Sequence, residues 1–150
     1  TLRAGTLVVI GLAIAALRCA PIQRDGTYAF TAEEIVKDEC GFLAHPDDLW
    51  DGTLRVDGEL FRMQTELFGM ELVGRALEVG DGFYLDGTAF NISAPVGGQI
   101  CQFDHVAVSI RADSESPTAF TGVFRADYLT EREDRCQCEL WVRFRATRVE

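Results

Sequence analysis

The residues with the clearest potential for acid–base chemistry lie in one short stretch of the chain. The carboxylates of this stretch stand close to His45, one of two histidines in the sequence, and are Asp47, Asp48 and Asp51. Such a group could transfer protons in a small hydrolase, and clustered carboxylate oxygens could also hold Ca²⁺. The spacing differs from that of the helix-flanked calcium loop, and acidic loops are expected where 24 residues are acidic. We therefore interpret the stretch as a solvated loop and keep the hydrolase as an alternative function.

Other catalytic signatures are missing from the sequence. It has no Gly-x-Ser-x-Gly elbow, no phosphate loop with a Gly-Lys-Ser sequence and no His-Glu-x-x-His motif. The second histidine, His105, falls on the polar face of an expected strand. The glycine pair in PVGGQI, residues 95–100, indicates a loop only. We expect no enzyme activity, no cofactor and no metal.

The cysteines carry more information, because their number is odd. They are Cys19, Cys40, Cys101, Cys136 and Cys138. If Cys19 is removed or lipidated, four remain, an even number suited to two disulfides in an oxidising compartment. Cys136 and Cys138 point to the same face of an expected strand, so each should pair separately with Cys40 or Cys101, in an order that the sequence leaves open. The alternative is a four-thiolate zinc site, for which the spacing is poor.

The N-terminal segment has the features of an export signal. Residues 4–17 are uncharged and apolar, and they lie between Arg3 and Arg18. The stretch is shorter than the roughly 20 residues of a spanning helix and fits the apolar region of a secretory signal. A buried helix or a short membrane anchor is the alternative. We divide the chain into a signal helix over residues 1–18, a linker over residues 19–25 and a domain over residues 26–150.

The sequence Ala16-Leu17-Arg18-Cys19 resembles the processing site of bacterial lipoprotein precursors, with Arg18 where that family has a small residue. The resemblance implies that Cys19 becomes a lipidated N-terminus. Two acyl chains are enough for stable anchoring. The protein would then lie in the cell envelope, in the periplasm or on the outer membrane, held to the membrane by this lipid anchor.

From residue 26 onward, apolar and polar residues mostly alternate, which indicates half-buried β-strands. The inward-facing sets are Val106, Val108 and Ile110; Phe120, Phe124, Ala126 and Tyr128; and Cys138, Leu140, Val142, Phe144 and Ala146. Asp57-Gly58 and Asp81-Gly82 suit tight hairpin turns, and we expect loops at residues 113–117 and 130–135. Thr31 and Glu34 could form a capping box that opens a short helix, although we prefer a continued strand there.

These elements predict an all-β fold, an antiparallel meander of about eight strands that forms a closed or nearly closed barrel, with a β-sandwich as the alternative. The layout is similar to that of the lipocalin and calycin group, without the Gly-x-Trp motif of that family. An eight-stranded barrel is either filled by its own side chains or holds one small ligand.

The charge of the chain restricts its partners. The net charge of −10 disfavours nucleic acid, because neutralising phosphates requires Lys and Arg. We expect an exported, lipid-anchored binding protein whose partner is a small apolar ligand or a basic protein. If the partner is a basic protein, the domain resembles the bacterial lysozyme inhibitors in architecture, and the partner would be a basic hydrolase of the cell envelope. Trp141, on the outer face of the last strand beside Arg143 and Arg145, could belong to a contact patch.

Overall fold

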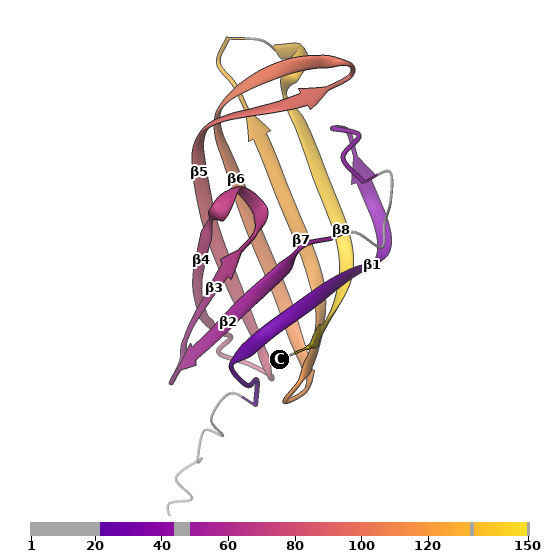
Figure 1. The fold of residues 1–150 in the computed structure, drawn as a ribbon. Helices are drawn as coiled ribbons and strands as arrows, with labels where there is room; N and C mark the ends of the chain where they lie inside the picture. Colours follow the sequence, from indigo (N-terminus) through magenta and orange to yellow (C-terminus); the bar gives the residue numbers. More distant parts are fainter. Residues whose placement is uncertain (1–21, 44–48, 133, 150) are drawn as a thin grey trace, which may run out of the picture.

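Eight strands, each paired in an antiparallel manner with its neighbours in the chain, form the domain in a computed structural model that describes residues 22–43, 49–132 and 134–149. The last strand pairs with the first, which closes the barrel (Figure 1). The strands are β1 (Gly26–Asp38), β2 (Asp51–Asp57), β3 (Leu60–Thr65), β4 (Glu71–Ala76), β5 (Gly82–Val96), β6 (Gln99–Ser116), β7 (Ala119–Leu129) and β8 (Cys138–Arg148), with short 3-10 turns η1 (Leu67–Gly69) and η2 (Asp134–Cys136). The predicted all-β barrel is confirmed, and the sandwich alternative is wrong.

The expected signal segment, residues 1–18, and Cys19 lie outside the described residues. In the described part of the chain, no helix has the length and apolar character needed to cross a membrane.

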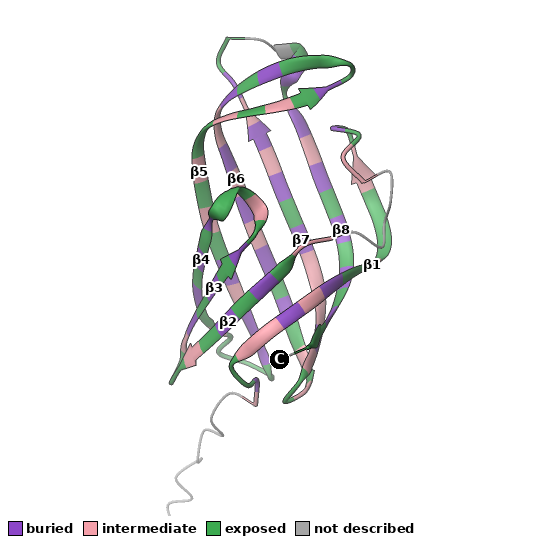
Figure 2. Ribbon diagram, viewed as in Figure 1, coloured by how far each residue is buried: buried purple, intermediate pink, exposed green. Residues whose placement is uncertain are grey.

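Burial alternates along the long strands, as the sequence pattern predicts (Figure 2). The predicted inward residues of β6, β7 and β8 are all buried in the barrel interior. Trp141 lies on the outside of β8 and is 40% exposed, as expected. The period-two pattern therefore fixes which face of each strand points inward.

β1 continues as a strand through Thr31 and Glu34, the residues of the possible capping box, as predicted. It pairs with β8 as far as the contact between Asp38 and Leu140, with register shifts after Ala32 and Ile35. A helix at Thr31 would have left the backbone of β8 without its ladder partners, an exposed edge that barrel closure removes.

The loop predicted at residues 113–117 is wrong. β6 runs to Ser116, and the chain turns at Pro117 and Thr118 before β7 begins. The polar residues of this stretch lie on a strand because they continue the pairing with β7, with Asp113 opposite Thr121 and a register shift next to Ser116. Hydrogen bonds to the neighbouring strand outweigh the low strand propensity of Asp and Ser.

The two ends of the barrel differ in construction. We call the end with the β6–β7 turn and the C-terminus the base, and the opposite end the mouth (Figure 1). Residues 22–25, part of the expected linker, lie against the base: the Gln23 side-chain amide donates to the Tyr28 hydroxyl at 2.8 Å, and the Arg24 amide donates to the Pro117 carbonyl at 2.9 Å. Buried Gln23 and Tyr28 thus close this end.

At the mouth, the β5–β6 hairpin extends past the other strands and bends (Figure 1). Asn91, within β5, has a φ of 55°, in the left-handed region. Gly97 and Gly98, with φ of 59° and 82°, make the hairpin turn, for which two positive φ values suit the twist of the strands. The hairpin packs Ile92 and Ala94 against the core of the barrel.

Candidate ligand-binding site at the mouth of the barrel

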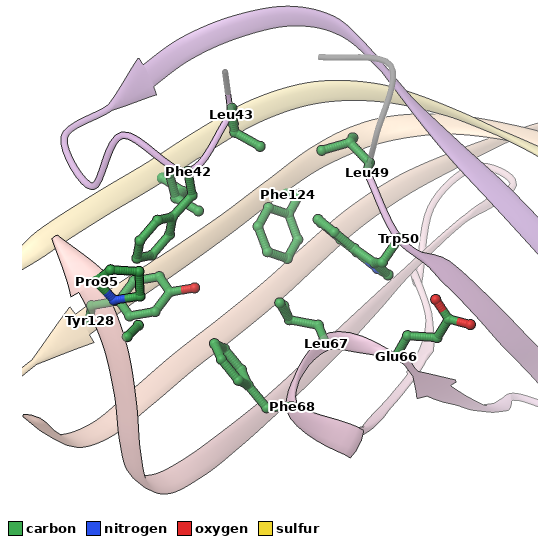
Figure 3. Close-up of a pocket in the computed structure, with 12 residues that line it drawn as sticks. Phe42, Leu43, Leu49, Trp50, Glu66, Leu67, Phe68, Pro95, Phe124 and Tyr128 are labelled. Atoms are coloured by element: carbon green, nitrogen blue, oxygen red, sulfur yellow. The ribbon is translucent and has the colours of Figure 1, made fainter. Parts of the chain in front are cut away.

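A cavity of about 480 Å³ opens at the mouth (Figure 3). Its size lies within the range of roughly 300–1,000 Å³ that is usual for small-molecule sites. Most of its lining side chains are aromatic or aliphatic. They are Phe42, Leu43, Leu49, Trp50, Glu66, Leu67, Phe68, Ala94, Pro95, Phe124, Tyr128 and Leu140. The site is therefore apolar, with a few polar groups that could orient a ligand.

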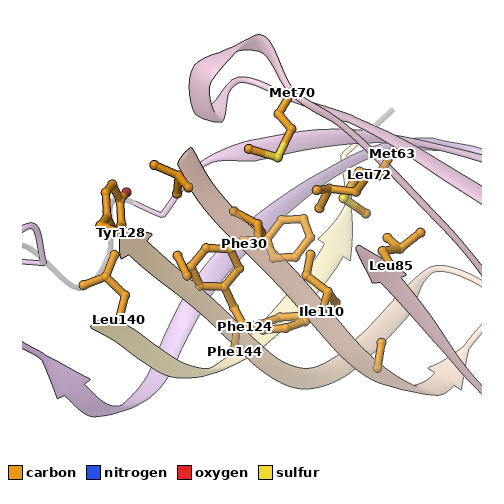
Figure 4. Close-up of a cluster of buried hydrophobic side chains, with 14 of the residues drawn as sticks. Phe30, Met63, Met70, Leu72, Leu85, Ile110, Phe124, Tyr128, Leu140 and Phe144 are labelled. Atoms are coloured by element: carbon orange, nitrogen blue, oxygen red, sulfur yellow. The ribbon is translucent and has the colours of Figure 1, made fainter. Parts of the chain in front are cut away.

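The interior below this cavity is filled by side chains (Figure 4). Aromatic rings occupy the basal part: Phe61 stacks on Phe83 with centroids 4.4 Å apart, and Phe83 meets Phe120 edge-on at 5.1 Å. Phe144 is fully buried and lies 4.9 Å from Phe30. The barrel thus combines the two possibilities that the sequence left open, a packed interior below and an open cavity above.

Aromatic contacts hold the walls of the cavity. The indole ring of Trp50 lies 4.3 Å from the ring of Phe124 and is stacked on Phe30 at 5.7 Å. The ring of Tyr128 has Phe42 at 5.2 Å and Phe68 at 6.0 Å, both edge-on. Edge-on and offset pairs of this kind stabilise one another beyond their buried area. These ring pairs therefore support the part of the cavity wall that the described residues form.

The chain that follows β1 is held by one carboxylate. Asp38 accepts hydrogen bonds from the backbone amides of Gly41, Phe42 and Leu43 at 2.8, 3.1 and 3.0 Å. Charge-assisted bonds to backbone N–H groups are among the stronger hydrogen bonds in proteins. Asp38 thereby places Phe42 and Leu43 at the cavity.

A second tight turn, η1, supplies Leu67 and Phe68 to the cavity. The buried hydroxyl of Thr65 donates to the carbonyls of Leu67 and Met70, which fixes the turn. Phe68 itself has a φ of 56°, a conformation that is unfavourable for a bulky side chain. Strained residues of this kind persist where the surroundings hold them and gather at functional sites.

Two uncharged polar groups stand in this apolar wall, in addition to the carboxylate of Glu66. The indole N–H of Trp50 is buried and has no hydrogen-bond partner among the described residues. The hydroxyl of Tyr128 points into the cavity (Figure 3), and burial, followed by the charge of Asp38, raises the pKa of this phenol. Tyr128 is therefore a protonated, neutral donor at physiological pH.

The two disulfides lie at the mouth. Cys40 is bonded to Cys138, and Cys101 is bonded to Cys136. Cys136 and Cys138 pair separately, as predicted, and the zinc alternative is wrong because all four sulfurs are bonded in pairs. The first bridge joins the end of β1 to the start of β8, and the second joins the β5–β6 hairpin to the turn before β8. Both connect segments that frame the cavity.

The described residues do not form the acid–base group that the sequence offers for hydrolysis. His45, Asp47 and Asp48 lie outside them, and Asp51 is an exposed residue at the start of β2. His105 is half-buried on β6, with its ring 6.4 Å from that of Phe90. Within residues 22–43, 49–132 and 134–149, no group of three or more histidine, cysteine or acidic side chains is placed to hold a metal ion. The hydrolase stays a prediction.

Sequence reasoning missed most of the cavity. It placed Phe124 and Tyr128 in the interior but treated the stretch after β1 as a polar loop. The overlooked signal is the pair of apolar groups that flank this loop, Phe42-Leu43 and Leu49-Trp50. Large apolar side chains in a segment without strand alternation have to be buried against something.

Comparison of the chain with protein-family models, with curated proteins and with solved structures finds no match. The function of the mouth must therefore be argued from its own geometry.

Proposed function

We propose that this protein is an exported, lipid-anchored barrel that binds one small apolar ligand at its mouth and carries out no chemistry on it. The supporting observation is the 480 Å³ cavity lined by aromatic and aliphatic side chains. It lies in a barrel whose remaining interior is packed with its own residues. Apolar cavities with a few polar groups are the usual form of small-molecule sites.

Export is supported by the apolar segment of residues 4–17 and by the two disulfides, which form and persist in oxidising compartments. In this proposal Cys19 carries the lipid. Gln23, four residues later in the chain, lies at the base, where its side-chain amide donates to the Pro117 carbonyl of the β6–β7 turn. Four residues span at most about 14 Å. An anchored barrel would therefore hold its base close to the membrane and turn its mouth toward the aqueous side.

The two tryptophans make ligand binding directly testable, because one lines the cavity and the other lies outside the barrel. In a Trp141→Phe variant, Trp50 is the sole indole fluorophore. Titration with N-phenyl-1-naphthylamine, an apolar fluorescent probe, should give a saturable one-to-one change in Trp50 emission. The matched Trp50→Phe variant, which keeps only Trp141, should show little change. A linear response without saturation in the first variant would contradict the proposal.

The anchor is tested separately. Cells that express the full precursor and are fed a palmitate analogue should label the protein, and Cys19→Ser should abolish the label. Label that persists in this variant, or none on the wild type, would rule out anchoring at Cys19 without bearing on the cavity.

A basic protein partner is the second candidate function. It is favoured by the net charge of −10 and by two exposed apolar side chains of the β5–β6 hairpin, Phe90 and Ile100, each 68% exposed. Binding to a basic lysozyme should weaken steeply between low ionic strength and about 0.5 M salt, because salt screens exposed charges. Replacing both hairpin residues by serine should weaken the complex further. No measurable complex at low salt would exclude this lysozyme as the partner.

A further inference from the structure

We infer that the ligand of the mouth cavity is a neutral apolar molecule that carries a hydrogen-bond acceptor, such as the carbonyl oxygen of a ketone, ester or amide. This inference rests on the proposed function, since it assigns a chemical class to the occupant of that cavity. Three observations on the described residues support it: the indole N–H of Trp50, which has no partner among them, the hydroxyl of Tyr128, which points into the cavity (Figure 3), and a lining whose one charged group is the carboxylate of Glu66.

The indole N–H is the strongest of these. Trp50 is packed between Phe30 and Phe124, so its ring cannot turn to bring the N–H into water without losing both contacts. Buried donors in folded proteins are nearly always satisfied, and one that is not requires an explanation. Leaving it unpaired is unfavourable. Because Trp50 lines the cavity, a ligand acceptor that displaces the side chains covering the N–H would remove this penalty, and a pure hydrocarbon would not.

Tyr128 adds a second donor. Its ring is held by Phe42, Phe68 and Phe103, with the last at 5.1 Å. A phenol is protonated at neutral pH, and burial raises the pKa of Tyr128 further, so the hydroxyl can donate to a ligand as well as accept from one. Two neutral donors on a lining that is apolar apart from Glu66 select for a molecule with acceptor oxygens.

The charge of the site argues against an anionic ligand. Among the described residues that line the cavity, Glu66 is the one charged side chain and none is basic. The chain as a whole carries a net charge of −10. A free carboxylate would have to give up water in an apolar, negatively charged mouth without a cation to pair with. Esters and ketones are therefore favoured over the corresponding acids.

Three probes of nearly the same shape separate these properties. 2-Ethylnaphthalene has no acceptor on its side chain, 2-acetylnaphthalene has a carbonyl group in place of the methylene group, and 2-naphthoate carries a negative charge. Isothermal titration of the wild type should show the ketone binding about tenfold more tightly than the hydrocarbon, in line with one hydrogen bond to a formerly unpaired donor. The naphthoate should bind more weakly than the ketone.

Variants assign the effect to named groups. Trp50→Phe retains an aromatic ring and removes the N–H, so it should bring the ketone and hydrocarbon affinities close together. Trp141→Phe is the matched control and should leave their ratio unchanged. Tyr128→Phe should reduce the ratio in part. Equal affinities of the two probes for the wild type would overturn the inference, whereas no binding of any probe would contradict the proposed function itself.

A direct readout does not depend on the folding of a cavity variant. The Trp141→Phe protein has one indole N–H, whose proton resonance should move downfield with 2-acetylnaphthalene and much less with 2-ethylnaphthalene. If both probes bind and the two shifts are equal, the N–H does not donate to the ligand and the inference is wrong.

Discussion

The two disulfides should differ in their contribution to stability, because they close loops of different length. The bridge between Cys40 and Cys138 joins residues 98 apart in sequence, and that between Cys101 and Cys136 joins residues 35 apart. In the chain-entropy account these loops correspond to about 4.7 and about 3.8 kcal/mol. The smaller loop lies inside the larger, so each intact bridge shortens the effective loop of the other and these figures are upper values. We therefore expect the contributions of the two bridges to the free energy of unfolding to differ by about 0.9 kcal/mol.

The comparison requires two double variants, Cys40→Ala with Cys138→Ala and Cys101→Ala with Cys136→Ala. Alanine leaves no buried polar group at either position. Urea unfolding followed by circular dichroism, with linear extrapolation, gives the free energy of unfolding of each. Loss of the longer loop should cost more. If loss of the Cys101–Cys136 bridge costs as much or more, that bridge acts through native contacts of the β5–β6 hairpin, and the entropic reasoning is refuted.

Four further predictions follow from single side chains. Phe68→Gly relieves a positive φ but removes a cavity wall, so stability should change by less than about 1 kcal/mol while naphthylamine affinity falls several-fold. Gly122→Ala would place a Cβ 2.0 Å from a backbone oxygen of β6, and thermal unfolding should show a loss of about 3 kcal/mol or an insoluble protein. Asp38→Ala removes the acceptor of three backbone N–H hydrogen bonds; it should cost about 2 kcal/mol in urea unfolding and also weaken probe binding, with Asp38→Asn intermediate. The hydrogen bond from Lys37 lowers the pKa of Glu139. The stability that this ion pair provides is therefore present at neutral pH and is lost as the pH falls through the lowered pKa. Glu139→Gln should flatten the acid side of the plot of unfolding free energy against pH, measured by urea unfolding.

Most of the fold could be predicted from the sequence because one physical rule dominates it. A strand with one face in the barrel and one in water must alternate, and the inward residues predicted on β6, β7 and β8 follow this rule. The rule failed where pairing overrode composition, at residues 113–117. It is also silent on register shifts such as the one after Ala32, which depend on how β1 bends to meet β8.

The cavity was harder to predict, because its residues come from segments without periodicity. Phe42 is placed by hydrogen bonds to Asp38, and Phe68 by a backbone conformation that no propensity would suggest for phenylalanine. The even number of cysteines after Cys19 predicts two disulfides. Which cysteine bonds to Cys40 depends on the pairing of β1 with β8, and the partner is Cys138. Alternation thus predicts the walls of a barrel, whereas turns and caps decide what its open end contains.

The contrast between the alternating strands and the turns at the mouth also explains why the barrel is packed at its base and open at its mouth. At the base, Gln23 and Tyr28 bond to each other and to the β6–β7 turn, and the rings beneath the mouth fill the interior. At the mouth, the two disulfides and Asp38 hold the loops from outside the cavity, so the loops need no packed interior to stay in place. A site supported in this way can stay open without collapsing, because its order does not depend on filling it. Reduction of both bridges should therefore lower probe affinity more than it lowers strand content, as measured by titration and circular dichroism on the same sample. Parallel losses of the two would show that the mouth and the barrel form a single cooperative unit.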